Sequence, residues 1–494
     1  MGDDPKTSAR PSRRAALALG AGVAGLAALD GPTPARAVAA GSPQNVDVIV
    51  VGAGFAGLTA ARRLHRAGHS VQVLEADDRV GGRTKPGRIA GETVDLGGQW
   101  VGPTQTRLLA LAQEYRVATY QQYATGKNII DVAGHRAAYE GETPALEPAA
   151  LGEFADMVAR IETLAAQIQA PRSWEWRDAG GYDAQTIETW ILANAQTAGA
   201  RMGMRLLVRT LLSAEAAQVS MLCLLAYAAA AGGFSPLIAT RRGAQDAIFE
   251  GGVWQLADKM AAELGGAVTL NAPVLSIAQD DGSAIAATPN AALRGRYVIV
   301  TAPPSLASRI QYAPPLPALR DGLTQRMPMG CVIKVHVAYG APFWRRQGLT
   351  GLVLSDRTEF GPWFDHSPRH GRSGDLVGFF NGATAQRWAD RSVEDRRAQV
   401  LHDISMYFGD AALSPADYIE EVWTRSGIHR GGYVATAGPG VLTAFGPALL
   451  APVGRIHWAG TETAEAWTGY IDGAIRSGER VAETVATLLV NEPR

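Results

Sequence analysis

A glycine turn between two apolar segments constrains this chain more than any other feature. Residues 46–51 read Val-Asp-Val-Ile-Val-Val, then Gly52-Ala53-Gly54-Phe55-Ala56-Gly57 follows, and a second apolar segment, residues 71–74, ends at Glu75. Such a turn lets backbone N–H groups approach a pyrophosphate, and the positive end of the following helix faces the charge. Glu75 stands about 20 residues after the glycines, where a carboxylate can accept ribose hydroxyls. The pattern predicts a dinucleotide-binding strand–turn–helix unit; the alternative is a glycine-rich helix start without a ligand.

A second match to the same glycine spacing, at residues 20–25, lacks this context. It follows Ser12-Arg13-Arg14 rather than a strand, and no second strand ending in an acid comes after it. We therefore do not interpret it as a dinucleotide site.

The N-terminal segment is instead typical of an export signal. Paired arginines open a mildly apolar run to Leu29, and Ala35-Arg36-Ala37 follows. These features predict a twin-arginine signal over residues 1–40 and a periplasmic or extracellular location. Ala16 stands where such signals usually carry phenylalanine, so a disordered cationic tail and a cytoplasmic location are the alternative.

Composition excludes several classes of protein. The 494 residues carry a net charge of −1 and no basic stripe, so we expect no nucleic-acid partner. Cys223 and Cys331 are the only cysteines, which excludes a disulfide scaffold and a thiolate metal cluster. His366 and His370 have helical spacing, but Pro368 between them indicates a loop. We interpret both as surface histidines and predict no metal ion. No apolar run reaches the roughly 18–20 residues of a membrane-spanning helix, so we expect no membrane span.

The remaining pattern predicts an α/β fold in which a Rossmann-like domain is interrupted twice. Residues 120–235 show apolar positions at helical spacing, which predicts a helical insertion. A strand at 331–339 lies in the second insertion, and we expect it to pair with 350–354 and 375–380. The predicted nucleotide-binding domain comprises 46–119, 250–323 and 426–490, and an α+β substrate-binding domain comprises 120–249 and 324–425.

Two groups of motifs make the chain resemble the flavin-containing monoamine oxidases, within the flavin amine oxidase superfamily. The first is Pro314-Pro315-Leu316-Pro317 with Gly330-Cys331-Val332-Ile333-Lys334. The second is Ala459-Gly460-Thr461-Glu462-Thr463 with Trp467-Thr468-Gly469-Tyr470. Both are specific to that family, and the likeness extends over nearly everything after residue 46. The resemblance implies the two-domain amine oxidase fold, and FAD rather than a nicotinamide cofactor.

The resemblance also implies where FAD would lie. Glu75 would hold the adenosine ribose, Arg83 would sit near the pyrophosphate, and Val274 would meet the adenine through its backbone. Glu462 and its neighbours would serve the ribityl-phosphate region. The full set of predicted cofactor-binding residues is Gly52, Gly54, Phe55, Ala56, Gly57, Glu75, Arg83, Gly97, Gly98, Gln99, Val274, Trp423, Gly460, Thr461, Glu462 and Ile471, of which Gly97, Gly98, Trp423 and Ile471 would adjoin the isoalloxazine.

Three residues are predicted by the resemblance to be catalytic. Tyr433 and Tyr470 match the two aromatic residues that flank the substrate amine, and their π faces can orient an amine. Lys334 matches the lysine that reaches the flavin through a water. A lysine in an otherwise apolar strand needs a partner, although its stem could instead extend to the surface. Taken alone, each tyrosine would be a core or rim residue.

Two departures from the mammalian enzymes are informative. They bond FAD through a cysteine just before the first cage tyrosine, a position that is Gly432 here, so we predict non-covalent FAD. They also end in a membrane helix, and we expect none here. Ile238 and Gln245 match cavity-lining residues, but the rest of the first insertion is too divergent for residue-level assignments.

The resemblance implies oxidation of a primary or secondary amine to an imine, which hydrolyses to an aldehyde or ketone, with O₂ reduced to H₂O₂. Two alternatives stay open: a dehydrogenase that passes electrons to a protein acceptor, and a non-catalytic FAD-binding interaction protein. An L-amino acid substrate would call for a cavity arginine, and Arg241 and Arg242 stand near Ile238. A polyamine would call for carboxylates that the sequence does not place, and an alkaloid is a further option. A homodimer is compatible with the resemblance, and no sequence feature decides it.

Overall fold

The computed structural model describes residues 44–492. The predicted export signal at 1–40 lies outside the described residues, and it stays a prediction. Within residues 44–492, none of the helices combines the length and the apolar character needed to cross a membrane.

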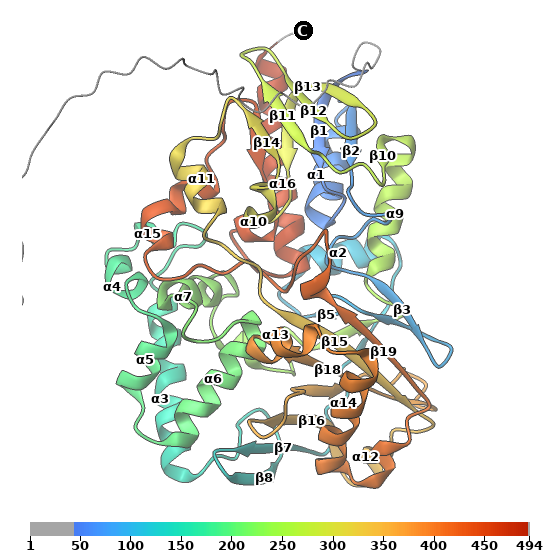
Figure 1. Ribbon diagram of the computed structural model, residues 1–494, viewed down its shortest axis with the longest axis vertical. Helices are drawn as coiled ribbons and strands as arrows, with labels where there is room; N and C mark the ends of the chain where they lie inside the picture. Colours follow the sequence, from blue (N-terminus) through green and yellow to red (C-terminus); the bar gives the residue numbers. More distant parts are fainter. Residues whose placement is uncertain (1–43, 493–494) are drawn as a thin grey trace, which may run out of the picture. The chain divides into compact units, whose positions relative to one another are not determined.

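The first sheet is built around the segment that carries the glycine turn (Figure 1). Strand β1 (Gln44–Val51) pairs in parallel with β2 (Val71–Leu74) on one side and with β13 (Ala292–Val300) on the other. Residues 48–50 of β1 are completely buried, as expected for a parallel strand covered on both faces. The strand order is β10 (Val268–Thr269), β2, β1, β13, β12 (Ala284–Ala287), β11 (Ser276–Gln279) and β14 (Gln311–Ala313), with β20 (Ile456–Trp458) paired to β13.

Three helices cover one face of this sheet. Helix α1 (Phe55–Arg66) begins directly after the turn and packs against α9 (Trp254–Leu264) and α16 (Ile471–Asn491). The close approach of α1 requires glycine at residue 57, because a Cβ there would lie 1.9 Å from the carbonyl oxygen of Gly52. The final helix therefore returns to the domain that contains the turn, as the interrupted pattern predicts.

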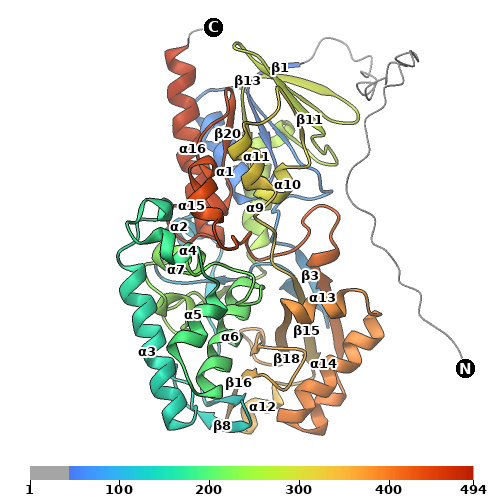
Figure 2. The same ribbon diagram turned by 60° about the vertical axis from the view of Figure 1, so that its left-hand side comes forward.

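A group of helices between residues 148 and 230 forms a separate layer (Figure 2). It contains α3 (Pro148–Ala165), α5 (Ile187–Asn194), α6 (Ala198–Leu212) and α7 (Met221–Ala230). The side chains of Thr186, Thr197 and Ser220 cap the last three by accepting from a backbone N–H three residues on. The predicted helical character of this region is confirmed from residue 148.

The start of that region is not helical, and the prediction there is wrong. Strands β6 (Thr119–Gln121), β7 (Lys127–Val132) and β8 (His135–Tyr139) occupy it. Strand β7 pairs in parallel with β16 (Leu349–Ser355). Pairing with a strand more than 200 residues away decides the conformation of β7, although the local sequence pattern predicts a helix.

The second sheet carries the strand that contains Lys334. Strand β15 (Val332–Tyr339) pairs with β18 (Gly374–Asn381) as expected, but its other neighbour is β19 (Asp417–Val422) rather than β16. Strand β16 instead lies between β7 and β17 (Trp363–Asp365). Residues 333, 335 and 337 of β15 belong to the core that α14 (Val393–Phe408) completes. Residues 332, 334 and 336 therefore face the opposite side, towards the segment 95–99.

Shorter elements connect these layers. They are α2 (Thr106–Glu114), α4 (Ala179–Asp183), α8 (Ser235–Ile238), α10 (Pro304–Ala307), α11 (Ala318–Thr324), α12 (Phe343–Arg346), α13 (Ala383–Ala389), α15 (Val441–Phe445), β3 (Pro86–Ile89), β4 (Glu92–Asp95), β5 (Trp100–Val101) and β9 (Ala247–Phe249).

Candidate active site

One cavity of about 620 Å³ extends from the glycine turn to the second sheet. One part, here the turn end, is formed by Gly52, Gly54, Phe55, Ala56 and Glu75. The other part, here the aromatic end, is formed by Trp100, Thr210, Leu211, Tyr227, Ala244, Gln245, Phe364, Phe379, Tyr433 and Tyr470. The size of the cavity suits a bound small molecule or cofactor.

Most of the residues singled out in the sequence line this cavity. They are Gly52, Gly54, Phe55, Ala56, Glu75, Arg83, Gly97, Gly98, Gln99, Gln245, Val274, Lys334, Trp423, Tyr433, Gly460, Thr461, Tyr470 and Ile471. The structure thus brings together side chains that are up to about 400 residues apart in the sequence.

Three of the residues do not line it. Gly57 lies beneath the turn and packs α1 against it. Glu462 is buried behind the cavity wall, where its carboxylate binds Arg83 at 2.8 Å and accepts the backbone N–H of Ala435. Ile238 packs against the core of the helical layer. Glu462 therefore orients a residue of the wall rather than forming the wall itself.

The turn end fits the adenosine part of a dinucleotide. The Glu75 carboxylate is buried and accepts the backbone N–H groups of Ala53 and Asp77. Burial raises its pKa, although both N–H groups act in the opposite direction. The first turn of α1 contains no acidic residue, so its N–H groups are available to an anion.

The segment 97–99 fits a flat group lying against backbone. A Cβ on Gly97 would lie 2.1 Å from the carbonyl oxygen of Arg83, and one on Gly98 would lie 3.3 Å from Ile471. The Nε2 atom of Gln99 is buried without a hydrogen-bond partner. A polar ring bound in the cavity would accept a hydrogen bond from this unpaired amide donor.

Lys334 is the buried cation of the cavity, with 2% of its surface exposed. Its Nζ donates to the carbonyl oxygens of Asp95 at 2.5 Å and Gly97 at 2.8 Å, and to Oε1 of Gln99. Burial lowers the pKa of Lys334 to about 7, although the nearby carboxylates of Asp95 and Asp375 raise it. The lysine stem therefore does not extend to the surface, and its amine titrates near neutral pH.

The two tyrosines are partly buried and protonated. Tyr433 donates its hydroxyl hydrogen to Oδ1 of Asn381 at 3.1 Å. Tyr470 packs edge-on against Trp467 and stacks on Tyr227, with ring centroids 4.9 and 6.0 Å apart. Burial raises the pKa of Tyr433 above its usual value and that of Tyr470 to about 12, so both are neutral phenols at neutral pH.

Several residues of the aromatic end were missed in the sequence. Tyr227 lies in α7, whose apolar run was read as a buried helix, and Phe364 and Phe379 lie on strands of the second sheet. Trp100 directly follows the predicted Gly97–Gln99 segment. Its position next to predicted cofactor-binding residues was the one sequence signal that could have identified a residue of the aromatic end.

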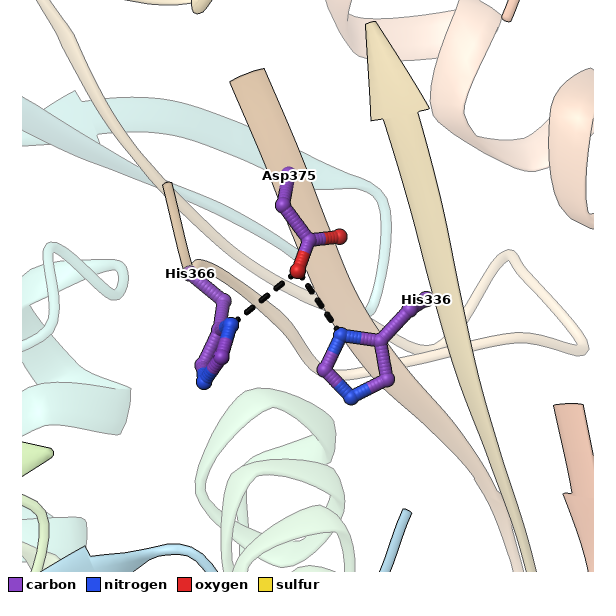
Figure 3. A group of neighbouring side chains, drawn as sticks. All are labelled: His336, His366 and Asp375. Atoms are coloured by element: carbon purple, nitrogen blue, oxygen red, sulfur yellow. Dashed lines mark hydrogen bonds and ion pairs between the residues drawn. The ribbon is translucent and has the colours of Figure 1, made fainter. Parts of the chain in front are cut away.

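The interpretation of His366 as a surface residue is wrong. His366 is 5% exposed, and its Nδ1 lies 3.0 Å from Oδ2 of Asp375 (Figure 3). The same oxygen lies 2.8 Å from Nδ1 of His336. His370 is exposed, as expected. The loop containing Pro368 was predicted correctly, but the second sheet covers one of its two histidines.

Comparison with known proteins decides the family. Residues 55–486 match the family described as flavin containing amine oxidoreductase. The chain belongs to this family. This protein is therefore an enzyme with the α/β, two-domain amine oxidase fold. Its substrate is a small-molecule amine.

Three relatives show how the family varies. A putative flavin-containing monoamine oxidase, AofH, of Mycobacterium tuberculosis is 39% identical over 90% of this chain and 98% of its own. An L-amino acid dehydrogenase of Synechocystis is 39% identical over 90% of this chain and 95% of its own. The solved cyclohexylamine oxidase of Brevibacterium oxydans has a TM-score of 0.86 and 32% identity, over 90% of this chain and 99% of that one.

The cofactor of this amine oxidoreductase is FAD, held without a covalent bond. Gly432 occupies the position before Tyr433 and offers no side chain for a linkage. Among the described residues that line the cavity there is no cysteine, since Cys223 and Cys331 lie outside it.

Proposed function

We propose that this enzyme oxidises a primary or secondary monoamine with an uncharged, apolar body to the imine, with O₂ reduced to H₂O₂. The imine then hydrolyses to a carbonyl compound and ammonia or a smaller amine. FAD supplies the two-electron redox chemistry. The protein binds and orients the amine and excludes water.

The main support for this proposal is that the aromatic end has no carboxylate among its described residues. Among the described residues that line the cavity, the only carboxylate is Glu75, which lies at the turn end. A diamine would need a carboxylate for its second ammonium group, and the aromatic end has none. An uncharged amine body therefore fits this end better than a polyamine does.

The arginines of the enzyme also argue against an amino acid substrate. Arg83 lines the cavity, but Glu462 already binds its guanidinium. Arg241 and Arg242 are exposed and do not line the cavity. No arginine of the aromatic end, as far as the described residues show, is free to bind a substrate carboxylate.

The side chains of the aromatic end can orient an amine without ionising. Tyr433 and Tyr470 are neutral phenols whose rings can contact the amine nitrogen. The Arg83 guanidinium donates to the carbonyl oxygen of Tyr433 and is paired with Glu462. Burial of Lys334 favours its uncharged form. We find no group that must act as a general base, so the substrate enters as the neutral amine and the pH profile of kcat/KM should contain the pKa of the substrate.

A panel of amines tests the proposal. The purified holoenzyme is mixed anaerobically with cyclic and aromatic monoamines, diamines and L-amino acids, and the flavin absorbance is followed before and after admission of air. We expect monoamines to bleach the flavin and air to restore it, with H₂O₂ formed. Faster bleaching by an L-amino acid, or very slow recovery in air, would instead favour a dehydrogenase like the Synechocystis relative.

Replacing Tyr433 by alanine tests the orientation of the amine. We expect Tyr433→Ala to lower kcat/KM for a monoamine by roughly 10–100-fold, because it removes one aromatic wall beside the nitrogen. Tyr433→Phe retains the ring and loses only the hydroxyl group, with its hydrogen bonds to Asn381 and Ser213, so its loss should stay within about 5-fold. Equal losses in both variants would contradict a role for the ring.

A carboxylate introduced into the aromatic end tests whether its absence explains the expected preference for monoamines over diamines. Gln245 lines the aromatic end, and Gln245→Glu changes its charge with little change in shape. We expect kcat/KM for a short diamine to rise about 10-fold relative to that for a monoamine of the same length. Gln167→Glu, on the exposed end of the helical layer, is the matched control and should leave the ratio unchanged. An unchanged ratio in Gln245→Glu would show that the second ammonium group of the diamine does not lie near residue 245.

A further inference from the structure

One stretch of the cavity wall also faces solvent. Residues 426–430, here the strap, follow β19 and precede Tyr433 of the aromatic end. Gly427, Ile428 and His429 line the cavity, yet Gly427 is exposed and Ile428 keeps 37% of its surface exposed. A segment that lines a cavity and faces solvent is part of the outer wall. The position of the strap therefore bears on whether a bound molecule can leave.

The strap is anchored at both of its ends. Before it, the Trp423 indole donates to the carbonyl oxygen of Leu96 at 2.8 Å. After it, the backbone N–H of Gly432 donates to the carbonyl oxygen of Gly330 at 3.0 Å. Neither anchor reaches the loop that follows Glu75, so the middle of the strap needs a contact of its own with the turn end.

His429 makes that contact. Its Nε2 lies 3.1 Å from Oδ2 of Asp77 and 3.2 Å from Nη2 of Arg79, two residues of the loop after Glu75. Its ring also packs edge-on against Trp423, with ring centroids 5.2 Å apart. Among the described residues, no other side chain of the strap has a hydrogen bond or ion pair with this loop.

The charges around His429 favour the contact in either tautomer of the ring. Burial lowers the pKa of His429, and Arg79 and Arg83 also disfavour a charge on it, so the ring is largely neutral at neutral pH. Burial would raise the pKa of Asp77, but His429 and Arg79 outweigh it and hold that pKa below its usual value. A ring with its proton on Nε2 donates to the Asp77 carboxylate, and the other tautomer accepts from the Arg79 guanidinium. Both are hydrogen bonds to a charged partner, which are the stronger kind.

The partners of His429 belong to the part of the wall that fits the cofactor. The backbone N–H of Asp77 donates to the Glu75 carboxylate at 2.8 Å. The Arg79 guanidinium donates to the carbonyl oxygen of Gly82 at 2.9 Å. Glu75 and Gly82 both line the cavity. The strap is thus fastened to the same loop that forms the turn end.

We propose that His429 is a positioning residue, which holds the strap against Asp77 and Arg79 and thereby retains FAD in the cavity. Gly432 offers no side chain for a covalent linkage, so retention depends on the walls of the cavity. The inference concerns the cofactor and does not depend on which amine is oxidised.

The test is the rate at which FAD leaves the holoenzyme. The holoenzyme is mixed with a large excess of 5-deaza-FAD, and the exchange is followed by the absorbance of the protein after rapid gel filtration. We expect His429→Ala to release FAD about 10-fold faster, because it removes one hydrogen bond to a charged partner. The association rate of FAD with the flavin-free variant, measured by flavin fluorescence, should not fall.

Matched variants separate the hydrogen bond from packing. His429→Gln retains a donor and an acceptor, so its release rate should stay within about 3-fold of the unmodified enzyme. His429→Phe keeps a ring against Trp423 but has no nitrogen, so it should release FAD as fast as His429→Ala. His370→Ala breaks another pair between a histidine and a carboxylate, on an exposed loop, where Nε2 of His370 lies 3.0 Å from Oε1 of Glu92. It should leave the rate unchanged.

A double-mutant cycle identifies the partner. The factor by which His429→Ala speeds release should be smaller in an Asp77→Ala background, because one of the two partners of the ring is already absent. An equal factor in both backgrounds would show that His429 does not act through Asp77.

Several outcomes would overturn the proposal. They are an unchanged release rate in folded, FAD-loaded His429→Ala, an equal rise in His370→Ala, and an unmodified rate in His429→Phe. A fall in the association rate of His429→Ala would also overturn it, since the variant would then damage the binding site instead of freeing the strap. If His429→Ala does not fold, the comparison of His429→Gln with His429→Phe makes the same test with side chains that fill the space.

Discussion

Replacing Lys334 by methionine is expected to lower amine turnover by roughly 10²–10³-fold while FAD stays bound. Methionine has a similar length and no charge, so it removes the ammonium with little change in volume. The carbonyl oxygens of Asp95 and Gly97 then lose a charged donor at the wall that supports the flavin. Saturating kcat and the ratio of bound flavin to protein measure the two effects separately.

The control for this variant is Lys259→Met on the exposed side of α9. It removes the same charge from the chain but touches neither the cavity nor the segment 95–99, so kcat should stay within about 2-fold of the unmodified enzyme. If Lys334→Met keeps its flavin and turns over amine at the rate of this control, Lys334 has no role in the reaction.

Replacing Glu75 by glutamine is expected to weaken FAD binding by roughly 10²–10³-fold. The buried carboxylate offers two acceptor oxygens to ribose hydroxyls, and hydrogen bonds to a charged group contribute about 1.5–3 kcal/mol each. Glutamine keeps the shape, but it turns one acceptor into a donor beside the N–H groups of Ala53 and Asp77. The dissociation constant can be measured by titrating the flavin-free protein with FAD and following flavin fluorescence.

Glu483→Gln is the matched control, since it makes the same exchange on the exposed face of α16. Its affinity for FAD should equal that of the unmodified enzyme. Should Glu75→Gln bind FAD as tightly as this control, the ribose is not held by Glu75. A lower melting temperature of flavin-free Glu75→Gln would show that the change acts on the turn itself rather than on the ligand.

Much of the fold could be predicted where the pattern is local. The strand β1, the turn at Gly52 and the helix α1 follow one another directly. Strands β7 and β8 were missed, because a partner strand more than 200 residues away stabilises them. Local patterns cannot show such pairing.

The candidate site was predictable to the extent that it follows motifs. Lys334, Tyr433 and Tyr470 lie in the cavity, as the resemblance implied. His366 was misread as a surface residue, and Tyr227 was placed correctly in a buried helix but not recognised as lining the cavity, because each was judged by its own segment. Their surroundings come from other elements: Tyr470 stacks on Tyr227, and Asp375 accepts from His366.

The sequence by itself determined the cofactor and the family, because the glycine turn, Glu75 and the motifs around Lys334 and Tyr470 are each short, contiguous patterns. Only the tertiary structure decided the charge around those residues. It shows that the aromatic end of the cavity contains no carboxylate among the described residues, and that the buried Lys334 amine donates to the backbone of Asp95 and Gly97. The physical reason is that burial and the pairing of β15 with β18 set the electrostatics of the site, and both depend on residues that are distant in the chain.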